Sequence, residues 1–506
     1  MCTVNSSHIS SISKETIALS FSFLNIIDIL IVRRVNCKWR SISFLRQASP
    51  MSIEVDVNDT DRMYATIAQM FPRKLVIIKS PMLRKPRQKA PFGTFAKYFD
   101  ILCTIPTVEE LTIVIDDSIR SLSSLVHLTR LTSLDIQLSG NSRVDPLKPI
   151  GEILSLRRLT LRLLDNNNNN NNGGWCIGRS LRSLTKLEVI QLPGLYGGRE
   201  DEADDCKISL RDDIPLLPKT LTNLDIHYTN ILHSDDMIGW NAFLTIPLTS
   251  VSIGLALGPS RIHDLIMRQS NLTCLSCQSM TASNEVSFNR WTNIRELNIR
   301  TLAPATLTRC LVDIPSLRTL RCNVGSTGGW DSTTFDGLTG KTTPITTLTI
   351  GGNELDMAYD GRGEMGVLHP DNLNALCTML APNLTNLCLD YHNGYCDGVS
   401  LEMLSAFSSL TSLTIDNYSF KTTTQLPTLP HLVELLLDLK PAKYCYPPIS
   451  TIVKLYPQLT SLNYYETSKD RIDVNGLDAL KLLNGEVVKW VVCTHTITTP
   501  CALCVH

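Results

Sequence analysis

The sequence has almost no net charge and no apolar run long enough to cross a bilayer. Its 506 residues include 47 Lys and Arg against 48 Asp and Glu, for a formal net charge of −1. Because nucleic-acid and polyanion binders are usually basic, this balance argues against that class of function. The most apolar stretch, residues 17–32, would span about 24 Å as a helix, against about 30 Å of hydrocarbon core. It contains Asp28 and lacks the basic start and cleavage site of a secretory signal, so we expect no contact with a membrane.

No catalytic or nucleotide-binding constellation stands out either. Residues 361–366 fit the pattern G-x-G-x-x-G, but they begin eleven residues after Ile350 rather than directly at the end of a strand. Residues 340–342 resemble the end of a phosphate-binding loop. Phe335, however, occupies the position of that loop's first glycine, where a side chain keeps the backbone away from a phosphate. We therefore expect a chain that is not an enzyme and needs no cofactor.

The sixteen cysteines are spread along the chain. A large chain of this kind without a secretory signal is typical of the cytoplasm or the nucleus, where thiols stay reduced. The C-terminal tail holds five possible zinc ligands within fourteen residues, at Cys493, His495, Cys501, Cys504 and His506. A zinc site and a frayed chain end are both open interpretations. Because the tail has a single pair with Cys-x-x-Cys spacing, we expect no metal.

One six-residue pattern recurs through most of the chain: apolar, two residues, apolar, one residue, apolar. We call it the kernel, number its positions one to six, and count fourteen copies. Clear copies are LTSLDI (131–136), LRRLTL (156–161), LTNLDI (221–226), IRELNI (294–299), ITTLTI (345–350), LTNLCL (384–389) and LTSLTI (410–415). The fourth positions run from residue 111 to residue 462, so the mean of the thirteen steps is 27 residues. Steps of this length are typical of solenoid repeats.

Kernel positions four and six alternate with position five, as a strand with one buried face requires. A repeat buries three kernel side chains at about 1.5–3 kcal/mol each, whereas ordering about 27 backbone units costs ~1–2 kcal/mol apiece. A single repeat therefore cannot fold alone, and neighbouring repeats must stack. From about residue 107 to 466 the pattern resembles the leucine-rich-repeat family. That resemblance implies an α/β solenoid with a curved parallel sheet on its concave face.

The exposed kernel positions are the candidate binding surface. Many hold Thr or Ser, which fits either a hydrogen-bonding surface for a partner or simply a solvated strand face, and we favour the second interpretation for any single Thr. Charged residues are rarer there, and Arg is enriched at binding hot spots. We predict that a protein substrate binds at six charged positions, of which the last four lie side by side on neighbouring strands. They are Arg157, Arg158, Arg295, Glu296, Arg318 and Arg321.

Near the N-terminus, residues 12–42 read ISKETIALSFSFLNIIDILIVRRVNCKWRSI and resemble the F-box, a small helical module. The match to the family pattern is gapless. Ser13 replaces the usual Pro, Asn25 replaces the first Asp of the turn, and Cys37 sits one place late. The resemblance implies helices that bind the adaptor subunit of a cullin-based ubiquitin ligase through Ile12, Glu15, Phe21, Leu24, Asp28, Leu30, Val35 and Trp39. The alternative is a helical cap for the end of the repeat array.

The whole chain is therefore expected to be a leucine-rich-repeat solenoid with a small N-terminal all-α module. The expected parts are a disordered N-terminus (1–11), the F-box-like module (12–50), a basic linker and the start of the solenoid (51–106), the repeats (107–466, with an Asn-rich and acidic insertion at 165–206), and a C-terminal cap and tail (467–506). The basic stretch between residues 62 and 97 fits either a nuclear-import signal or a solvated linker.

The order of an F-box before leucine-rich repeats implies the substrate-recognition subunit of an SCF-type cullin ubiquitin ligase. In that function the helices bind the adaptor subunit and the repeats bind a protein substrate. No nucleic acid is expected as a partner. Two alternatives stay open. One is a repeat scaffold without a ligase role, and the other is a membrane-anchored repeat receptor.

Overall fold

The computed structural model describes residues 52–56, 73–78, 99–100, 102–115, 121–139, 147–164, 177–192, 214–226, 237–283, 285–324, 343–352, 376–390, 401–416, 426–438, 449–466 and 489–494. The F-box-like segment, residues 12–50, lies outside them. So do residues 165–176 and 193–206 of the insertion and most of the C-terminal tail.

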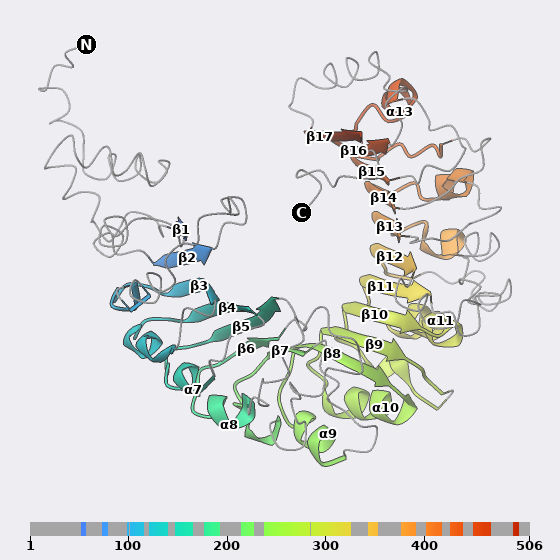
Figure 1. Cartoon of the computed structure of the whole chain (residues 1–506). Helices are drawn as coiled ribbons and strands as arrows, with labels where there is room; N and C mark the ends of the chain where they lie inside the picture. Colours follow the sequence, from blue (N-terminus) through green and yellow to red (C-terminus); the bar gives the residue numbers. More distant parts are fainter. Residues whose placement is uncertain are drawn as a thin grey trace, which may run out of the picture. The chain divides into compact units, whose positions relative to one another are not determined.

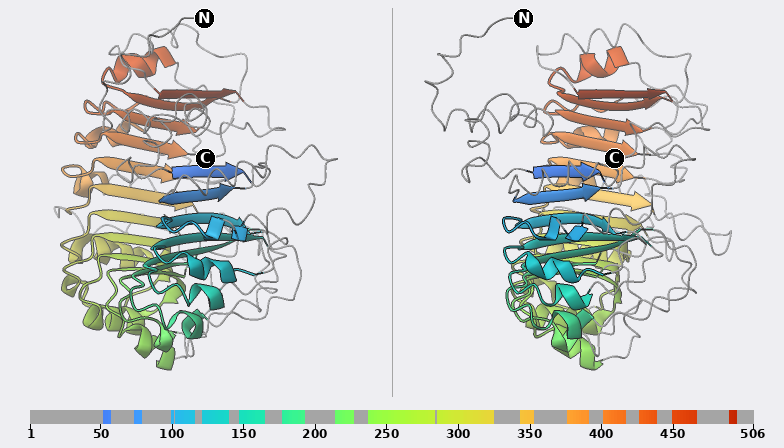
Figure 2. Two further views of the ribbon diagram at one scale, coloured as in Figure 1. Left: turned by 90° about the vertical axis from the view of Figure 1, so that its left-hand side faces the viewer. Right: turned by 60° about the vertical axis from the view of Figure 1, so that its left-hand side comes forward.

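The chain divides into two compact units, residues 1–248 and residues 249–506. In each unit the strands stack side by side and run in the same direction, and the helices lie on the other side of the repeats (Figures 1 and 2). Among the described residues, a typical repeat thus contributes one strand to a parallel sheet and one short helical segment to the opposite face. Each unit is therefore a segment of a leucine-rich-repeat solenoid.

Every described strand of the first unit pairs in parallel with the next along the chain. These strands are β1 (Ser52–Asp56), β2 (Lys74–Ile78), β3 (Glu110–Ile115), β4 (Ser133–Ser139), β5 (Arg158–Leu164), β6 (Val189–Gln191) and β7 (Asn223–Ile226). The described part of its helical side includes the short elements η2 (Ser123–His127), α7 (Leu147–Ile150), α8 (Ile177–Leu181), η4 (Ile214–Leu216) and α9 (Met237–Phe243).

The second unit repeats this arrangement, again with parallel neighbours throughout. Its strands are β8 (Ser250–Leu257), β9 (Cys274–Met280), β10 (Glu296–Leu302), β11 (Thr319–Val324), β12 (Thr347–Gly352), β13 (Asn386–Asp390), β14 (Ser412–Asp416), β15 (Glu434–Asp438), β16 (Ser461–Glu466) and β17 (Lys489–Thr494). Its helical elements include α10 (Pro259–Arg268), η5 (Phe288–Arg290), α11 (Pro304–Asp313), η8 (Leu401–Ala406) and α13 (Ile449–Leu455).

The predicted phase of the repeats is confirmed by the strand register. In the first unit the fourth kernel positions are direct register partners from Leu111 to Leu224. In the second unit the same holds from Val251 to Leu462. The row extends beyond the fourteen predicted kernels, because Ile53, Leu75 and Trp490 occupy the same register position.

The core lies between the sheet and the helical layer. Kernel positions one, four and six are buried in the described repeats, with Leu192 at position six of its kernel as the half-buried exception; Leu131, Leu134 and Ile136 are at most 1% exposed. The helical layer adds larger side chains, such as Trp240 and Phe243, whose rings stack at 5.2 Å. Since most helical elements are too short to be stable alone, this shared core holds them in place.

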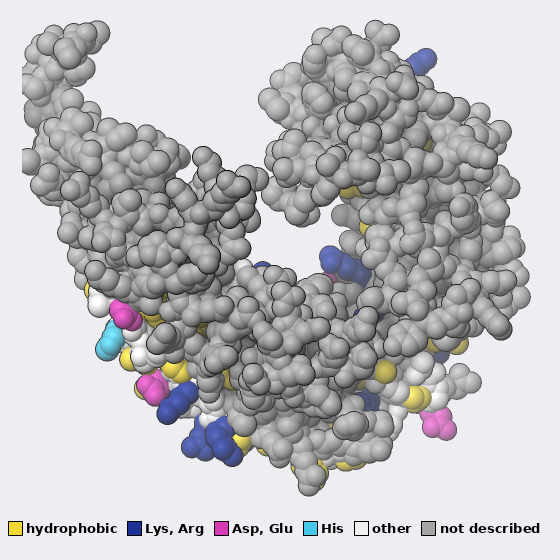
Figure 3. Space-filling view, in the orientation of Figure 1, with side chains coloured by type: hydrophobic (Ala, Val, Ile, Leu, Met, Phe, Trp, Pro, Cys, Tyr) yellow, Lys and Arg dark blue, Asp and Glu magenta, His cyan; other side chains and the backbone are white. Residues whose placement is uncertain are grey.

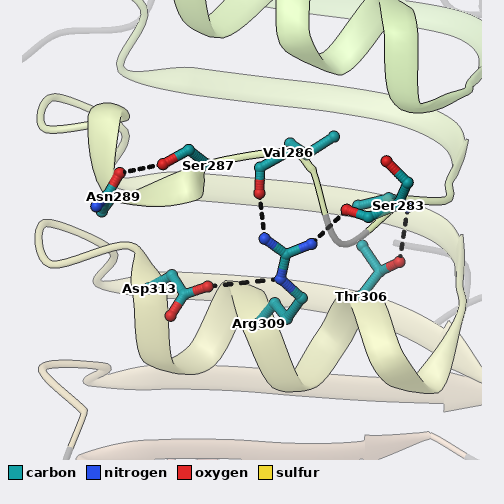
Figure 4. A network of polar contacts seen from close by, with 8 residues as sticks. Ser283, Val286, Ser287, Asn289, Thr306, Arg309 and Asp313 are labelled. Atoms are coloured by element: carbon teal, nitrogen blue, oxygen red, sulfur yellow. Dashed lines mark hydrogen bonds and ion pairs between the residues drawn. The ribbon is translucent and has the colours of Figure 1, made fainter.

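Two contacts show how closely neighbouring repeats pack. Gly151 ends α7 so near α8 that a Cβ atom there would collide with the main-chain oxygen of Ser180. In the second unit, the guanidinium group of Arg309 on α11 donates to the main-chain oxygens of Ser283 and Val286 in the preceding repeat (Figure 4). The same side chain pairs with Asp313 at 3.6 Å and lies 5.2 Å from the centre of the Phe288 ring. It therefore fastens one repeat to the next.

Candidate functional site

The open face of each sheet is the surface opposite the helical layer, and it carries kernel positions two, three and five. We call the residues that share one kernel position in successive repeats a row, and we add a row seven for the residue that follows the kernel. Along the sheet, the backbone N–H groups of rows two and three donate to the row-two main-chain oxygen of the preceding repeat. Thr411 and Ser412, for example, both donate to Thr385, at 2.8 and 3.0 Å.

Row two contains a repeated side-chain hydrogen bond, which we call the threonine ladder. At each ladder position the threonine hydroxyl donates to the same main-chain oxygen that accepts the two N–H groups, at distances of 2.9 to 3.4 Å. The members are Thr132, Thr222, Thr273, Thr346, Thr385, Thr411 and Thr460. Their hydroxyl hydrogens are used within the sheet, which favours the structural interpretation of these threonines over a contact with a partner.

The ladder is interrupted by charged residues at a few repeats. Between Thr273 and Thr346, row two holds Arg295 and then Arg318 in consecutive repeats. Their backbone N–H groups keep the sheet bonds, both at 2.8 Å, but arginine has no hydroxyl with which to continue the ladder. At these two repeats the sheet therefore lacks the hydroxyl hydrogen bond of the threonine ladder, and row two carries an exposed cation in its place.

In the first unit, most charges on or beside the open face are paired with one another. Arg157, a predicted contact residue, pairs with Glu188 at 2.7 Å, and Arg162 pairs with Asp135 at 3.1 Å. Similar pairs join Arg130 to Glu109 at 2.9 Å and Lys74 to Glu110 at 3.4 Å. Arg158 is exposed and has no ion-pair partner among the described residues. On the sheet face of this unit, neighbouring side chains of opposite sign thus compensate most of the charge.

The second unit differs, because four arginines lie close together on the open face of two adjacent repeats. We define the arginine patch as Arg295, Arg300, Arg318 and Arg321, from the β10 and β11 repeats. Glu296 lies beside Arg295 and is half-buried. In the described part of the chain, no carboxylate lies within ion-pair distance of these four guanidinium groups. The patch with Glu296 has a formal charge of +3. Among the described residues, Arg318 is the one patch arginine with side-chain hydrogen bonds, to the main-chain oxygens of Pro344 at 3.2 Å and Leu317 at 3.4 Å.

The structure places the four predicted central residues together, as the kernel spacing required. Glu296 is the register partner of Thr319, and Asn298 is the register partner of Arg321. Arg295 and Arg318 directly precede β10 and β11. Sequence reasoning missed Arg300, which stands in row seven on β10. It follows the kernel's last residue, and continuing the two-residue alternation one step further would have found it.

A polar row, which was not predicted from the sequence, crosses the first unit in row five. Asp135, Thr160, Gln191 and Asp225 are successive register partners in row five. The Thr160 hydroxyl donates to Gln191 Oε1 at 3.0 Å. Asp135 and Asp225 each have one buried carboxylate oxygen without a hydrogen-bond partner among the residues that the structure describes. Burial raises the pKa of Asp135, and the guanidinium group of Arg162 opposes that rise.

The described cysteines of the second-unit core are packing residues rather than nucleophiles. Cys277 and Cys322 lie in row six and are fully buried, and burial raises the pKa of both thiols to about 12. Burial also raises the pKa of Cys310 on α11, so these thiols are protonated at neutral pH. Within the described segments no group of three or more His, Cys, Asp or Glu residues is arranged to hold a metal. The tail ligands other than Cys493 lie outside those segments, so a metal-free tail stays a prediction.

Two further predictions concern the membrane and the adaptor. Among the helices that the structure describes, none combines the length and the apolar character needed for a membrane span. All eight expected adaptor-binding residues fall outside the described segments, so their role stays a prediction: Ile12, Glu15, Phe21, Leu24, Asp28, Leu30, Val35 and Trp39.

A second basic region lies on the helical side of the first unit. Lys and Arg side chains gather over α7 and α8 (Figure 3). Arg179, Arg182 and Lys186 are exposed there. These cations belong to the opposite side of the repeats from the sheet face, which makes them a matched control for the arginine patch.

The structure is similar to known leucine-rich-repeat proteins. A leucine-rich-repeat protein of Leptospira interrogans has a TM-score of 0.37 and 16% sequence identity, over 84% of this chain and 98% of that one. An internalin from Listeria monocytogenes has a TM-score of 0.28 and 12% identity, over 77% of this chain and 87% of that one. No family model and no curated protein matches the sequence. The strand register and the buried kernel positions establish the repeat architecture.

Proposed function

We propose that this chain recognises a protein partner on the open sheet face of its second unit, with the arginine patch as the main contact. The observation that carries this proposal is the interruption of the threonine ladder by unpaired cations. Arg295 and Arg318 replace residues that elsewhere bond within the sheet, and Arg321 stands exposed beside them. Arginine is also enriched at the energetic centres of protein interfaces.

The internal pairing of the first unit supports this choice of surface. A partner that binds at Arg157 must compete with Glu188 at 2.7 Å, whereas the patch arginines need not leave any described carboxylate. Exposed surface ion pairs contribute little stability, but they lower the charge that a partner senses at a distance. Electrostatic steering of an incoming partner therefore favours the second unit.

We further propose that this recognition serves an SCF-type cullin ubiquitin ligase, with the chain as the substrate-recognition subunit. The support is the gapless F-box resemblance of residues 12–42, which ends in Val35 and Trp39. In this function the N-terminal helices hold the ligase adaptor and the repeats hold the target, so the chain itself performs no chemistry. Such a complex would work in the cytoplasm or the nucleus.

The adaptor part is tested with purified full-length chain and purified adaptor subunit in a pull-down. We expect binding by the wild type and none by Trp39→Ala, because truncating a buried Trp costs about 3–5 kcal/mol and a module of this size has little stability to spare. Circular dichroism should show that the repeats of the variant stay folded. If the wild type does not bind at tens of micromolar, the ligase role is wrong and the chain is a repeat scaffold.

The recognition part is tested by charge reversal. The triple variant Arg295→Glu, Arg318→Glu and Arg321→Glu should lose capture of the partner from an extract. The control triple Arg179→Glu, Arg182→Glu and Lys186→Glu makes the same change in net charge on the helical side and should retain it. Equal capture by both variants, with unchanged circular dichroism, would place the partner on another surface.

A further inference from the structure

The arginine patch is long along the strands and narrow across them. Arg295 and Arg300 are separated by about 17 Å along β10, at ~3.3 Å per residue, whereas β10 and β11 are only about 4.8 Å apart. On β11, Arg318 and Arg321 are about 10 Å apart by the same rise. The four cations therefore follow the strand direction as an elongated array and do not converge on one point.

Uncharged residues border this array on both sides. On β9 and just before it, the open face presents Thr273, Cys274 and Gln278, with Ser276 buried between them. On β12 and just before it, it presents Thr346, Thr347 and Thr349. The cationic surface is thus two strands wide, which is about the width of one extended peptide backbone.

We propose that the occupant of the arginine patch is an extended, acidic peptide segment that lies along β10 and β11 and carries carboxylates at alternate residues. In an extended chain, side chains at i, i+2 and i+4 share one face and span about 13 Å. Three such carboxylates match the length of the array, and each meets a guanidinium group, a favourable pairing geometry. The proposal rests on the proposed function in one respect, that the second-unit sheet face binds a protein.

The dispersion of the cations favours separate carboxylates over a single phosphate. A phosphate is best held by two or more guanidinium groups that converge on its oxygens. Here Arg295 and Arg318 are neighbours in row two, but Arg318 already donates to Pro344 O at 3.2 Å, and Arg300 stands at the opposite end of the patch from Arg295. A nucleic acid is disfavoured as well, because a patch of four cations two strands wide offers few phosphate contacts.

Glu296 makes binding depend on where the acidic residues stand in the peptide. It is the anion within the cationic array, and its register neighbours Cys274 and Thr319 are uncharged. A carboxylate of the peptide opposite Glu296 would be repelled, whereas an uncharged or basic residue would be accepted. Glu296 therefore selects the spacing of the acidic residues as well as their number.

The test uses full-length chain and fluorescence anisotropy with two labelled peptides of identical composition. One has three Glu residues at alternate positions between glycines, and the other has the three in succession. We expect the alternating peptide to bind more tightly by about tenfold, because all three of its Glu side chains can face the patch, whereas at most two of three Glu residues in succession, the first and the third, can do so. Binding should weaken as salt rises. A peptide with a single phosphoserine and an oligonucleotide of equal charge complete the probe set.

Three variants test whether the peptide binds at the arginine patch. Arg295→Gln with Arg321→Gln should weaken binding of the alternating peptide by about tenfold or more, and Glu296→Gln should tighten it severalfold. Arg179→Gln with Arg182→Gln should leave it unchanged. Equal binding of the two acidic peptides, tighter binding of the phosphopeptide or the oligonucleotide, or an equal effect of the control variant would each overturn the proposal. Adaptor binding, measured on the same preparations, reports on the ligase role separately.

Discussion

The hydroxyl group of Thr411 donates to the main-chain oxygen of Thr385 at 3.1 Å, and that oxygen also accepts the backbone N–H groups of Thr411 and Ser412. Three donors therefore share one carbonyl, which has two lone pairs. Removing the hydroxyl leaves the oxygen fully bonded, so no buried acceptor is orphaned. The ladder bond thus adds stability in small, repeated amounts.

Thr411→Val should accordingly lower the free energy of unfolding by only about 0.5–1.5 kcal/mol. The measurement is the urea midpoint of the transition that reports the second unit. Thr414→Val provides the matched control, since it makes the same change in the same kernel at a row-five hydroxyl without a hydrogen bond among the described residues. A control that costs as much as Thr411→Val would show that the ladder contributes nothing.

Gly151→Ala should destabilise the first unit by about 1–3 kcal/mol, because the added methyl group must displace the backbone of the next repeat. The obstacle is the main-chain oxygen of Ser180, and Ser183 Oγ also donates to Gly151 O at 2.6 Å. Gly258→Ser is the contrasting variant, because nothing lies within 4 Å of a Cβ there and Gly258 caps α10. It should be neutral or slightly stabilising. Thermal melts that rank the two variants in the reverse order would contradict this account.

Arg309→Lys should cost about 1.5–3 kcal/mol although the charge is kept, because a lysine cannot donate in a fork to the oxygens of Ser283 and Val286. Arg290→Lys is the control. Arg290 is exposed, and its guanidinium group contacts the sulfur atom of Met267 at 3.0 Å, so its replacement should change stability by less than about 0.5 kcal/mol. Chemical unfolding of both variants decides the question, and equal losses would show that the fork is not what matters.

The raised pKa of Asp135 predicts a pH dependence of stability. The folded state then binds more protons than the unfolded state at pH values above 3.8, the ordinary value for this carboxyl. The unfolding free energy should therefore fall as the pH rises through the folded pKa. Asp135→Asn removes this titration, so the stability of the variant relative to the wild type should rise with pH and then level off. The opposite trend would mean that the ion pair with Arg162 outweighs burial.

The sheet was predictable because its signal is periodic and its register is fixed by burial. A kernel such as LTSLDI specifies which side chains face inward, and a shift by one residue would expose Leu134 and Ile136. The strands at Ile53, Leu75 and Trp490 were missed because Pro50 and Pro72 stand at position one of the first two kernels and Trp490 at position four of the third, where most kernels have Leu. The helical side was not predicted in detail, since α7 has four residues, and an element of one turn leaves no period to detect.

Kernel spacing predicted which charged residues of the site lie close together, but not which of them form ion pairs. The proximity of Arg295, Arg318 and Arg321 follows from kernel spacing alone. The pairing of Arg157 with Glu188 does not, because the two residues are 31 positions apart and separated by a long insertion. Whether a surface charge forms an ion pair depends on the side chains of the neighbouring strands. A single sequence does not show which of several nearby charges is close enough to pair. The adaptor-binding role of residues 12–50 stays a prediction.

The parallel register has a consequence for how this chain can vary. Leu348 and Leu387 are register partners although 39 residues separate them, while Leu297 and Leu320 are partners at a distance of 23. The surplus length between β12 and β13 follows the carboxyl end of β12, as the Asn tract follows that of β5. Chain length thus changes at one edge of each sheet without disturbing the rows. That edge is suited to display: reporter sequences or foreign epitopes grafted there would leave the recognition face unaltered.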